Sequence, residues 1–225
     1  MAPVKENLFR FFRGGAVENE SPEQAASSRV NRRSSGLKEF SKSISGQEGL
    51  CILDLGCTSA TNISRLTGTG HKVCTEDLLE AAHDPLLVVP GTDGNKTVDV
   101  MRFLRDSLAY QPQMFDAVLC WDVPDYLPEP LVKPVVERLC TLMKPGGILL
   151  AFFHTRDAGP DAPHYRYHIA GDDVLQLQAT ARGSHPVYRL QRVFNNRHIE
   201  NLFREFASLK FFLARDNVRE VIVVR

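Results

Sequence analysis

The chain has 225 residues, of which 43% are hydrophobic and 24% are charged, as in ordinary globular proteins. Its 27 basic and 27 acidic residues give a formal net charge of zero, which disfavours a nucleic-acid-binding protein. No apolar stretch approaches the roughly 20 residues of a membrane-spanning helix, so we predict no membrane span. The five cysteines contain no Cys-x-x-Cys pair. They argue against a disulfide framework or a structural zinc site and favour a cytoplasmic location.

The first 46 residues differ in character from the rest of the chain. Residues 14–35 are polar and have no apolar periodicity, which predicts a flexible tail. A short lead-in helix is predicted by three apolar residues at helical spacing: Leu37, Phe40 and Ile44. Four apolar residues near the start either dock on the domain or anchor the chain to a membrane surface or partner: Leu8, Phe9, Phe11 and Phe12.

Residues 47–225 read as one domain in which apolar runs alternate with amphipathic segments. Buried strands are expected at residues 50–55 and 115–120, a second strand at residues 71–75 and a further apolar strand at residues 148–153. Helices are expected at residues 62–66 and 131–143, while residues 101–108 read as a helix or an irregular lead into a turn. This alternation predicts an α/β fold: a Rossmann-like, doubly wound and mostly parallel sheet covered by helices.

The last third of the chain departs from this alternation. Residues 160–193 read as an inserted hairpin or lid, whose tyrosines and arginines either grip a small molecule or form a half-buried hairpin face. A helix capped by Asn195 or Asn196 precedes two strands, at residues 209–213 and 218–224. Their short connection predicts a hairpin, so one of these last strands runs antiparallel.

The most informative motif is the loop that follows the first predicted strand, Asp54-Leu-Gly-Cys-Thr-Ser-Ala60. Small residues there let the backbone approach a ligand and aim the next helix N-terminus at it. Asp77 ends the second strand about 20 residues after Gly56, where an acidic residue binds the ribose of a nucleotide. The alternative is that Gly56 makes only a tight turn and Asp77 caps a helix. The absence of Gly-x-Gly-x-x-Gly argues against an NAD or FAD site.

These segments, together with residues 115–127 and Met143-Lys-Pro-Gly-Gly147, resemble the class I S-adenosylmethionine-dependent methyltransferases over residues 49–155. The family loop reads Asp/Glu-x-Gly-x-Gly-x-Gly, whereas this chain has Thr58 and Ala60 at the second and third glycine positions. The resemblance implies S-adenosyl-L-methionine as cofactor. It also implies an SN2 methyl transfer to an unidentified acceptor, which we expect to be a small molecule.

The resemblance also implies positions for the cofactor contacts. The loop would lie against the methionine part, Asp77 would hold the ribose with Glu76 as its rival, and the turn at residues 106–108 would approach the adenine. The implied cofactor-binding residues are Asp54, Gly56, Cys57, Thr58, Ala60, Glu76, Asp77, Leu108, Trp121 and Asp122.

Three residues are candidates for acid–base catalysis because they follow the strands that end at the ligand-binding edge of such a sheet: Asp122, Tyr126 and His154. His154 is alternatively a hydrogen-bonded structural residue. Asp122 and Asp125 are alternatively helix caps, the interpretation we favour for Asp125. His164 and His168 fall on a predicted strand, where a spacing of four does not bring them together, so no metal site is predicted.

Two other function classes stay open. A nicotinamide-dependent oxidoreductase is disfavoured by the missing glycines. A non-catalytic cofactor-binding or scaffold relative of the methyltransferase fold is favoured by the same missing glycines and by the long tail. The sequence does not specify the oligomeric state.

Overall fold

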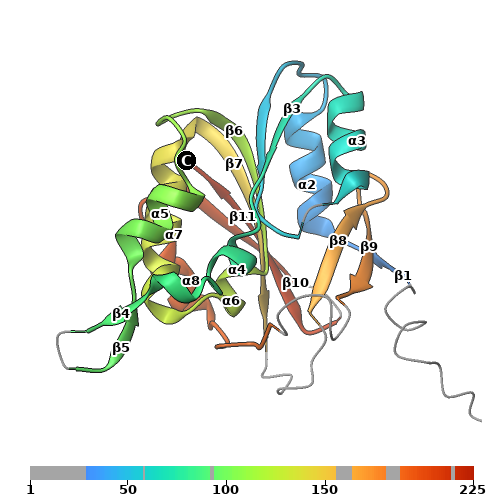
Figure 1. The fold of residues 1–225 in the computed structure, drawn as a ribbon. Helices are drawn as coiled ribbons and strands as arrows, with labels where there is room; N and C mark the ends of the chain where they lie inside the picture. The colour runs from blue at the N-terminus through green and yellow to red at the C-terminus, as the bar shows by residue number, and fades with distance from the viewer. Residues whose placement is uncertain (1–28, 58, 92–93, 156–163, 181–187, 214–215) are drawn as a thin grey trace, which may run out of the picture.

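The computed structural model describes residues 29–57, 59–91, 94–155, 164–180, 188–213 and 216–225. A six-stranded sheet with the order β10-β11-β7-β6-β2-β3 runs through the domain (Figure 1). Strands β3, β2, β6 and β7 are parallel, whereas β11 is antiparallel to β7 and β10 is antiparallel to β11. The predicted Rossmann-like sheet with an antiparallel C-terminal strand is therefore confirmed. The strands of this sheet are β2 (Cys51–Asp54), β3 (Lys72–Thr75), β6 (Phe115–Trp121), β7 (Met143–His154), β10 (Ser208–Leu213) and β11 (Val218–Val224).

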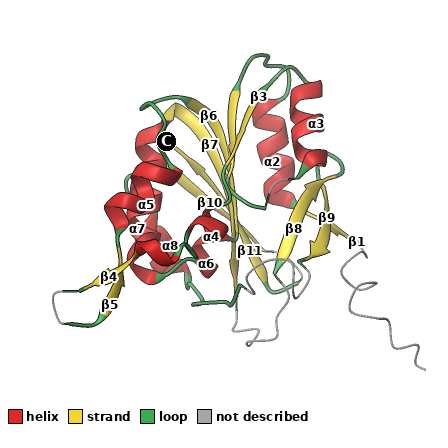
Figure 2. Cartoon of the chain, in the orientation of Figure 1, coloured by secondary structure: helices red, strands yellow, loops and turns green. Residues whose placement is uncertain are grey.

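Helices cover both faces of this sheet (Figure 2). The α5, α7 and α8 helices lie on one side, and α2 and α3 lie on the other. The helices are α2 (Ser35–Ile44), α3 (Ala60–Gly68), α4 (Leu78–Ala81), the 3₁₀ helix η1 (Pro85–Leu87), α5 (Val100–Ser107), α6 (Val123–Tyr126), α7 (Glu129–Leu142) and α8 (Asn196–Leu202). No helix of the described residues is long and apolar enough to cross a bilayer.

Strands β2 and β6 and the apolar part of β7 are buried on both faces, as their apolar runs predict, whereas the edge strand β3 is only partly buried. In β6, Val118 and Cys120 join the core on the α5–α7 side, while Ala117 and Leu119 join the core on the α2–α3 side. This alternation follows from the two-residue period of a strand. The lead-in helix is also confirmed as α2, since its three apolar residues are buried against β7 and β11.

A second, three-stranded antiparallel sheet lies beside α3, with the order β1-β9-β8. Strands β8 (Tyr165–Ile169) and β9 (Val174–Ala179) form the hairpin predicted within residues 160–193. Strand β1 (Arg29–Arg33) corrects the expectation of a flexible tail up to residue 35, because it pairs with β9 along its whole length. Its sequence lacks an apolar alternation, so the pairing depends on β9 and was not visible locally.

Other boundaries also differ from the prediction. The hairpin of β4 (Val88–Pro90) and β5 (Lys96–Val98) was not predicted. Strand β7 begins at Met143 and includes the Pro-Gly-Gly sequence that was expected to precede it, with a register shift against β6. The predicted tail before residue 29, with its four apolar residues, lies outside the described residues. So do residues 160–163 and 181–187 of the predicted lid.

Candidate functional site

The carboxyl ends of four parallel strands bring the predicted site residues to one edge of the sheet. The segments that follow β2, β3, β6 and β7 begin at residues 55, 76, 122 and 155. The main-chain amide of Glu76 donates to the carbonyl of Asp54 at 2.9 Å, which fixes the end of β3 beside the loop after β2. Ligands of open α/β sheets bind at this carboxyl edge.

Asp54 anchors the loop from inside the protein. One carboxylate oxygen accepts from the Trp121 indole Nε1 at 2.6 Å, and the other accepts from the Asn62 amide at 3.0 Å. Burial raises the pKa of Asp54 above its ordinary value even though these donors and the amide of Gly56 oppose the rise. Both oxygens are therefore held by the protein, and Asp54 fixes the loop.

Trp121 fills the space in front of the loop. A Cβ atom on Gly56 would lie 2.7 Å from its Cδ1 atom, so the loop needs glycine at this position. The indole also stacks on the Tyr167 ring of the hairpin, with centroids 5.1 Å apart and an interplanar angle of 7°. The backbone of Trp121 has φ 50°, in the left-handed region that side chains rarely adopt and that clusters at functional sites.

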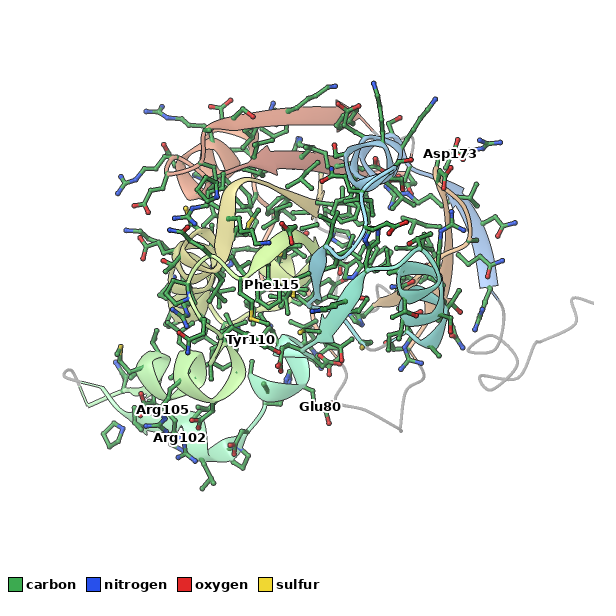
Figure 3. The ribbon with its side chains drawn as sticks, turned by 90° about the horizontal axis from the view of Figure 1, so that it is seen from above. Glu80, Arg102, Arg105, Tyr110, Phe115 and Asp173 are labelled. Atoms are coloured by element: carbon green, nitrogen blue, oxygen red, sulfur yellow. The ribbon has the colours of Figure 1, made fainter. Side chains whose placement is uncertain are left out.

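The two acidic rivals at the end of β3 have different partners. Glu76 accepts a short hydrogen bond from the Tyr110 hydroxyl, whose ring packs edge-on against Phe115 (Figure 3). Asp77 caps α4 by accepting from the Glu80 amide at 3.0 Å. Its remaining partner among the described residues is the Cys57 thiol. Burial and the charge of Asp77 raise the pKa of this thiol to about 12. Asp77 thus caps a helix, the alternative role considered for it, and also faces the loop after β2.

A row of five aromatic rings crosses the carboxyl edge from α4 to the end of β7. Successive centroids are 4.8–5.8 Å apart, and the rings meet edge to face. The row consists of His83, Tyr188, His164, Tyr126 and His154. Tyr126 and His154, both predicted site residues, are brought together here.

Tyr188 is a residue whose place in the site the sequence did not identify. It is buried, and its hydroxyl has no hydrogen-bond partner among the described residues. Burial and the nearby charges of Asp77, Cys57 and Glu80 raise the pKa of Tyr188. The segment that follows Tyr188 is anchored at Gln191, whose main-chain amide donates to the Asp125 carbonyl at 2.9 Å. An unpaired buried hydroxyl needs an explanation, and a bound ligand supplies one.

The two aspartates after β6 are both buried but have separate partners. Asp122 accepts from the Tyr167 hydroxyl at 2.7 Å. Asp125 accepts at one oxygen from the His154 main-chain amide at 2.7 Å and from the His154 ring Nδ1 at 2.8 Å. The preferred interpretation of Asp125 as a helix cap is therefore wrong. Asp122 occupies the N-cap position of α6 without a side-chain cap bond.

The pKa values of this pair follow from their burial and contact. Burial raises the pKa of Asp125 to about 6, although hydrogen bonds from His154 oppose the rise. Burial lowers the pKa of His154, but the hydrogen bond to Asp125 and the charges of Asp122 and Asp125 outweigh it, so the pKa is raised. Near neutral pH, Asp125 is therefore an ionised acceptor for the His154 ring.

The other predicted residues have structural roles in the elements that surround the site. Ala60 is the first residue of α3. Ser59 caps this helix, because its side-chain oxygen accepts from the main-chain amide of Asn62 at 3.2 Å. Leu108 ends α5 with its side chain fully buried. Thr58 is outside the described residues. His168 contacts Ser59 and Gln178, and no group of three or more potential metal-ligating residues occurs in the described part of the chain.

Comparisons with known proteins point to one family. Residues 24–206 match the family model described as "Methyltransferase domain". A ubiquinone biosynthesis O-methyltransferase of Bordetella pertussis is 28% identical over 150 residues, which cover 66% of this chain and 58% of that protein. Its namesake in Xylella fastidiosa strain M23 is 31% identical over 118 residues, covering 50% of this chain and 45% of that protein. The chain thus spans little more than half the length of the curated relatives it matches.

Solved structures are similar at lower identity. One is a Burkholderia thailandensis 1,6-didemethyltoxoflavin-N1-methyltransferase with bound 1,6-didemethyltoxoflavin and S-adenosylhomocysteine, at 13% identity and a TM-score of 0.46. The match covers 85% of this chain and 78% of that one. A SAM-dependent methyltransferase from Methanosarcina mazei is also 13% identical, with a TM-score of 0.44, covering 80% of this chain and 93% of that one.

Proposed function

Because the chain belongs to the methyltransferase-domain family, we propose that it binds S-adenosyl-L-methionine and transfers the methyl group to a small-molecule acceptor. The observation that carries the proposal is the position of Asp77, whose carboxylate stands beside the loop that Asp54 anchors. A carboxylate at this place accepts hydrogen bonds from both hydroxyls of a ribose. The buried, unpaired hydroxyl of Tyr188 lies near the same carboxylate.

The described residues fit the adenosyl end of this cofactor. Asp77 would hold the ribose hydroxyls, and the Tyr188 hydroxyl would complete a polar contact that has no partner within the described protein. The bound cofactor supplies a methyl group already activated on a positively charged sulfur. The carboxylates of Asp77 and Asp122 place negative charge at this edge, which favours a cation. The remaining task of the protein is to align the acceptor and exclude water.

The acceptor is proposed from the names of the relatives and from the charge of the chain. The curated relatives are named O-methyltransferases, which favours an oxygen acceptor here. A formal net charge of zero does not favour nucleic acid as the acceptor. The five cysteines are free thiols, which suits the proposed location in a reducing cytoplasm.

A second candidate is a non-catalytic scaffold relative, and one observation favours it. Both oxygens of Asp54 are bonded within the protein, and the Trp121 indole occupies the space against Gly56. A cofactor whose methionine part approaches this loop would meet groups that are already satisfied. In a scaffold, binding of the cofactor would be weak or absent.

Calorimetric titration with S-adenosylhomocysteine, with NAD as a control ligand, decides between the two candidates. The test variant is Asp77→Ser, because serine keeps a helix-capping oxygen while removing the carboxylate. We expect its affinity for S-adenosylhomocysteine to fall by roughly 10- to 150-fold, the equivalent of the ~1.5–3 kcal/mol of hydrogen bonds to a charged group.

The matched control is Asp84→Ser. Asp84 caps η1 by accepting from the Leu86 amide at 2.8 Å. Its affinity for S-adenosylhomocysteine should equal that of the unmodified protein. Absence of binding to the unmodified protein at millimolar ligand would overturn the proposed activity and favour the scaffold, and binding of NAD alone would favour an oxidoreductase.

A further inference from the structure

We infer that His154 is the general base that takes the proton from a hydroxyl acceptor, and that Asp125 positions its ring. This inference rests on the proposed methyl transfer and adds the catalytic group and the class of acceptor. It is carried by the geometry of the pair at the carboxyl ends of β6 and β7.

The contact between the two side chains selects one tautomer of the ring. Asp125 is fully buried, and as an ionised carboxylate it can only accept a hydrogen bond. The His154 Nδ1 atom, 2.8 Å from Asp125 Oδ2, must therefore carry the hydrogen. In the neutral ring this leaves the lone pair on Nε2, which makes no hydrogen bond to the described residues. The side chain is 15% exposed, so the ring is not closed off from solvent.

A purely structural role does not need the ring. The same Asp125 oxygen also accepts from the His154 main-chain amide at 2.7 Å, and this bond ties the end of β7 to α6 whatever side chain stands at position 154. The ring contact is additional to this tie. A buried carboxylate that orients a histidine whose other nitrogen is free is an arrangement that accepts protons efficiently.

The groups around the ring come from several elements. Asp122 and Asp125 act from the α6 side, Arg32 acts from β1, and His164 acts from the residue before β8. Tyr126 meets the ring edge to face, and opposite it in register β11 presents Val218. The two carboxylates outweigh Arg32, so an imidazolium formed by proton uptake is stabilised in place.

The proposed step transfers one proton to His154 and one methyl group to the acceptor oxygen. The acceptor O–H bond breaks and its proton moves to His154 Nε2. The acceptor oxygen forms a new O–CH₃ bond while the methyl–sulfur bond breaks, and that bond's electron pair remains on sulfur. The proton on the imidazolium is later released to solvent. An acceptor atom that bears no acidic hydrogen does not require this base, so the inference selects hydroxyl acceptors.

The experiment compares His154→Gln and Asp125→Asn with His198→Gln, an exposed histidine of α8, as the matched control. Binding of S-adenosylhomocysteine is measured first for each protein, because its loss in the unmodified protein would disprove the proposed function rather than this inference. The imidazole groups of the cofactor-free protein are then titrated by NMR. Above the pKa of His154 we expect a neutral ring with its hydrogen on Nδ1, and in Asp125→Asn we expect a lower His154 pKa.

The catalytic readout uses a panel of phenols and alcohols as hydroxyl probes, with matched thiols and amines, and follows S-adenosylhomocysteine release. In His154→Gln, kcat for the best hydroxyl probe should fall by about 10²–10⁴-fold with little change in KM, and its rise with pH should disappear. His198→Gln should behave as the unmodified protein.

Three outcomes would overturn the inference while cofactor binding persists. One is an NMR spectrum in which the neutral ring carries its hydrogen on Nε2. The second is a His154→Gln protein with an unchanged kcat and pH profile. The third is methylation of the thiol or amine probes without methylation of any hydroxyl probe.

Discussion

At the scale of single residues, the site is organised by contacts between its own side chains. Trp121 donates to Asp54, stacks on Tyr167 and leaves room only for glycine at position 56. The resemblance implied that Gly56 contacts the cofactor. In the structure, its neighbour is the indole of Trp121. The reason for glycine at this position is therefore steric.

We expect Gly56→Ala to destabilise the protein by about 1–3 kcal/mol, the usual cost of overpacking. The added methyl group would lie 2.7 Å from Trp121 Cδ1, and the indole is held by its bond to Asp54 and cannot move freely. Urea unfolding would measure the change. Gly68→Ala is the control, because a Cβ atom there meets nothing within 4 Å. Equal losses in both variants would disprove the steric explanation.

The raised pKa of His154 also predicts a pH dependence of stability. A group whose pKa is higher in the folded than in the unfolded protein stabilises the fold below its unfolded value, and this contribution is lost as pH rises through the folded value. For His154 the unfolded value is about 6.5. The stability difference between the unmodified protein and His154→Gln should therefore be larger at pH 6.5, where Asp125 with its pKa of about 6 is mostly ionised, than at pH 9. Urea midpoints across this range would measure it, and a constant difference would contradict the assigned direction.

At the scale of elements, the sequence predicted those segments whose own residues determine their structure. Strand β6 is an apolar run, and α2 has apolar residues at helical spacing, so both were predicted. Strand β1 was missed because its pattern is polar: its one apolar residue, Val30, is largely exposed. The role of Asp125 was also missed, since its partner His154 lies 29 residues away and is brought near only by the parallel pairing of β6 and β7.

Strand β1 carries a buried ion pair that connects it to the central sheet. Arg32 donates to Glu220 of β11 at 2.7 Å, and its guanidinium lies 5.0 Å from the centre of the Phe152 ring. Glu220 also accepts from the Gly36 amide at 2.6 Å, at the start of α2. One carboxylate thus joins three elements, β1, α2 and β11.

We expect Arg32→Ala to cost about 3–5 kcal/mol, because it leaves a buried charge on Glu220 without its partner. The neighbouring Arg33 is the matched control: its side chain is 81% exposed and pairs with Asp173, whereas that of Arg32 is 8% exposed. Arg33→Ala should change the free energy of unfolding by only about 0–1 kcal/mol. Chemical denaturation would compare the two, and similar losses would show that the burial of Arg32 has no special effect.

At the scale of the whole molecule, the proposed chemistry is confined to one edge of the sheet. A hollow of about 360 Å³ lies at the opposite edge, where Glu48 precedes β2 and His71 precedes β3. Another, of about 580 Å³, runs along the exposed side of α2. Neither hollow includes any residue of the candidate site, so ligands there would not compete directly with the cofactor.

The pairing of β1 with β9 also affects the order in which the protein is made and folded. Arg33 and its partner Asp173 are 140 residues apart in the chain, and Arg32 and Glu220 are 188 apart. During synthesis on a ribosome, β2, α3 and β3 can pair while β1 still lacks both partners. Strand β1, the first strand of the described residues, is therefore among the last to be paired. Until β9 has been synthesised, the edge of β1 is unpaired and can pair with other nascent chains. Slow translation of the second half of the chain would therefore lengthen the time in which β1 can misassemble.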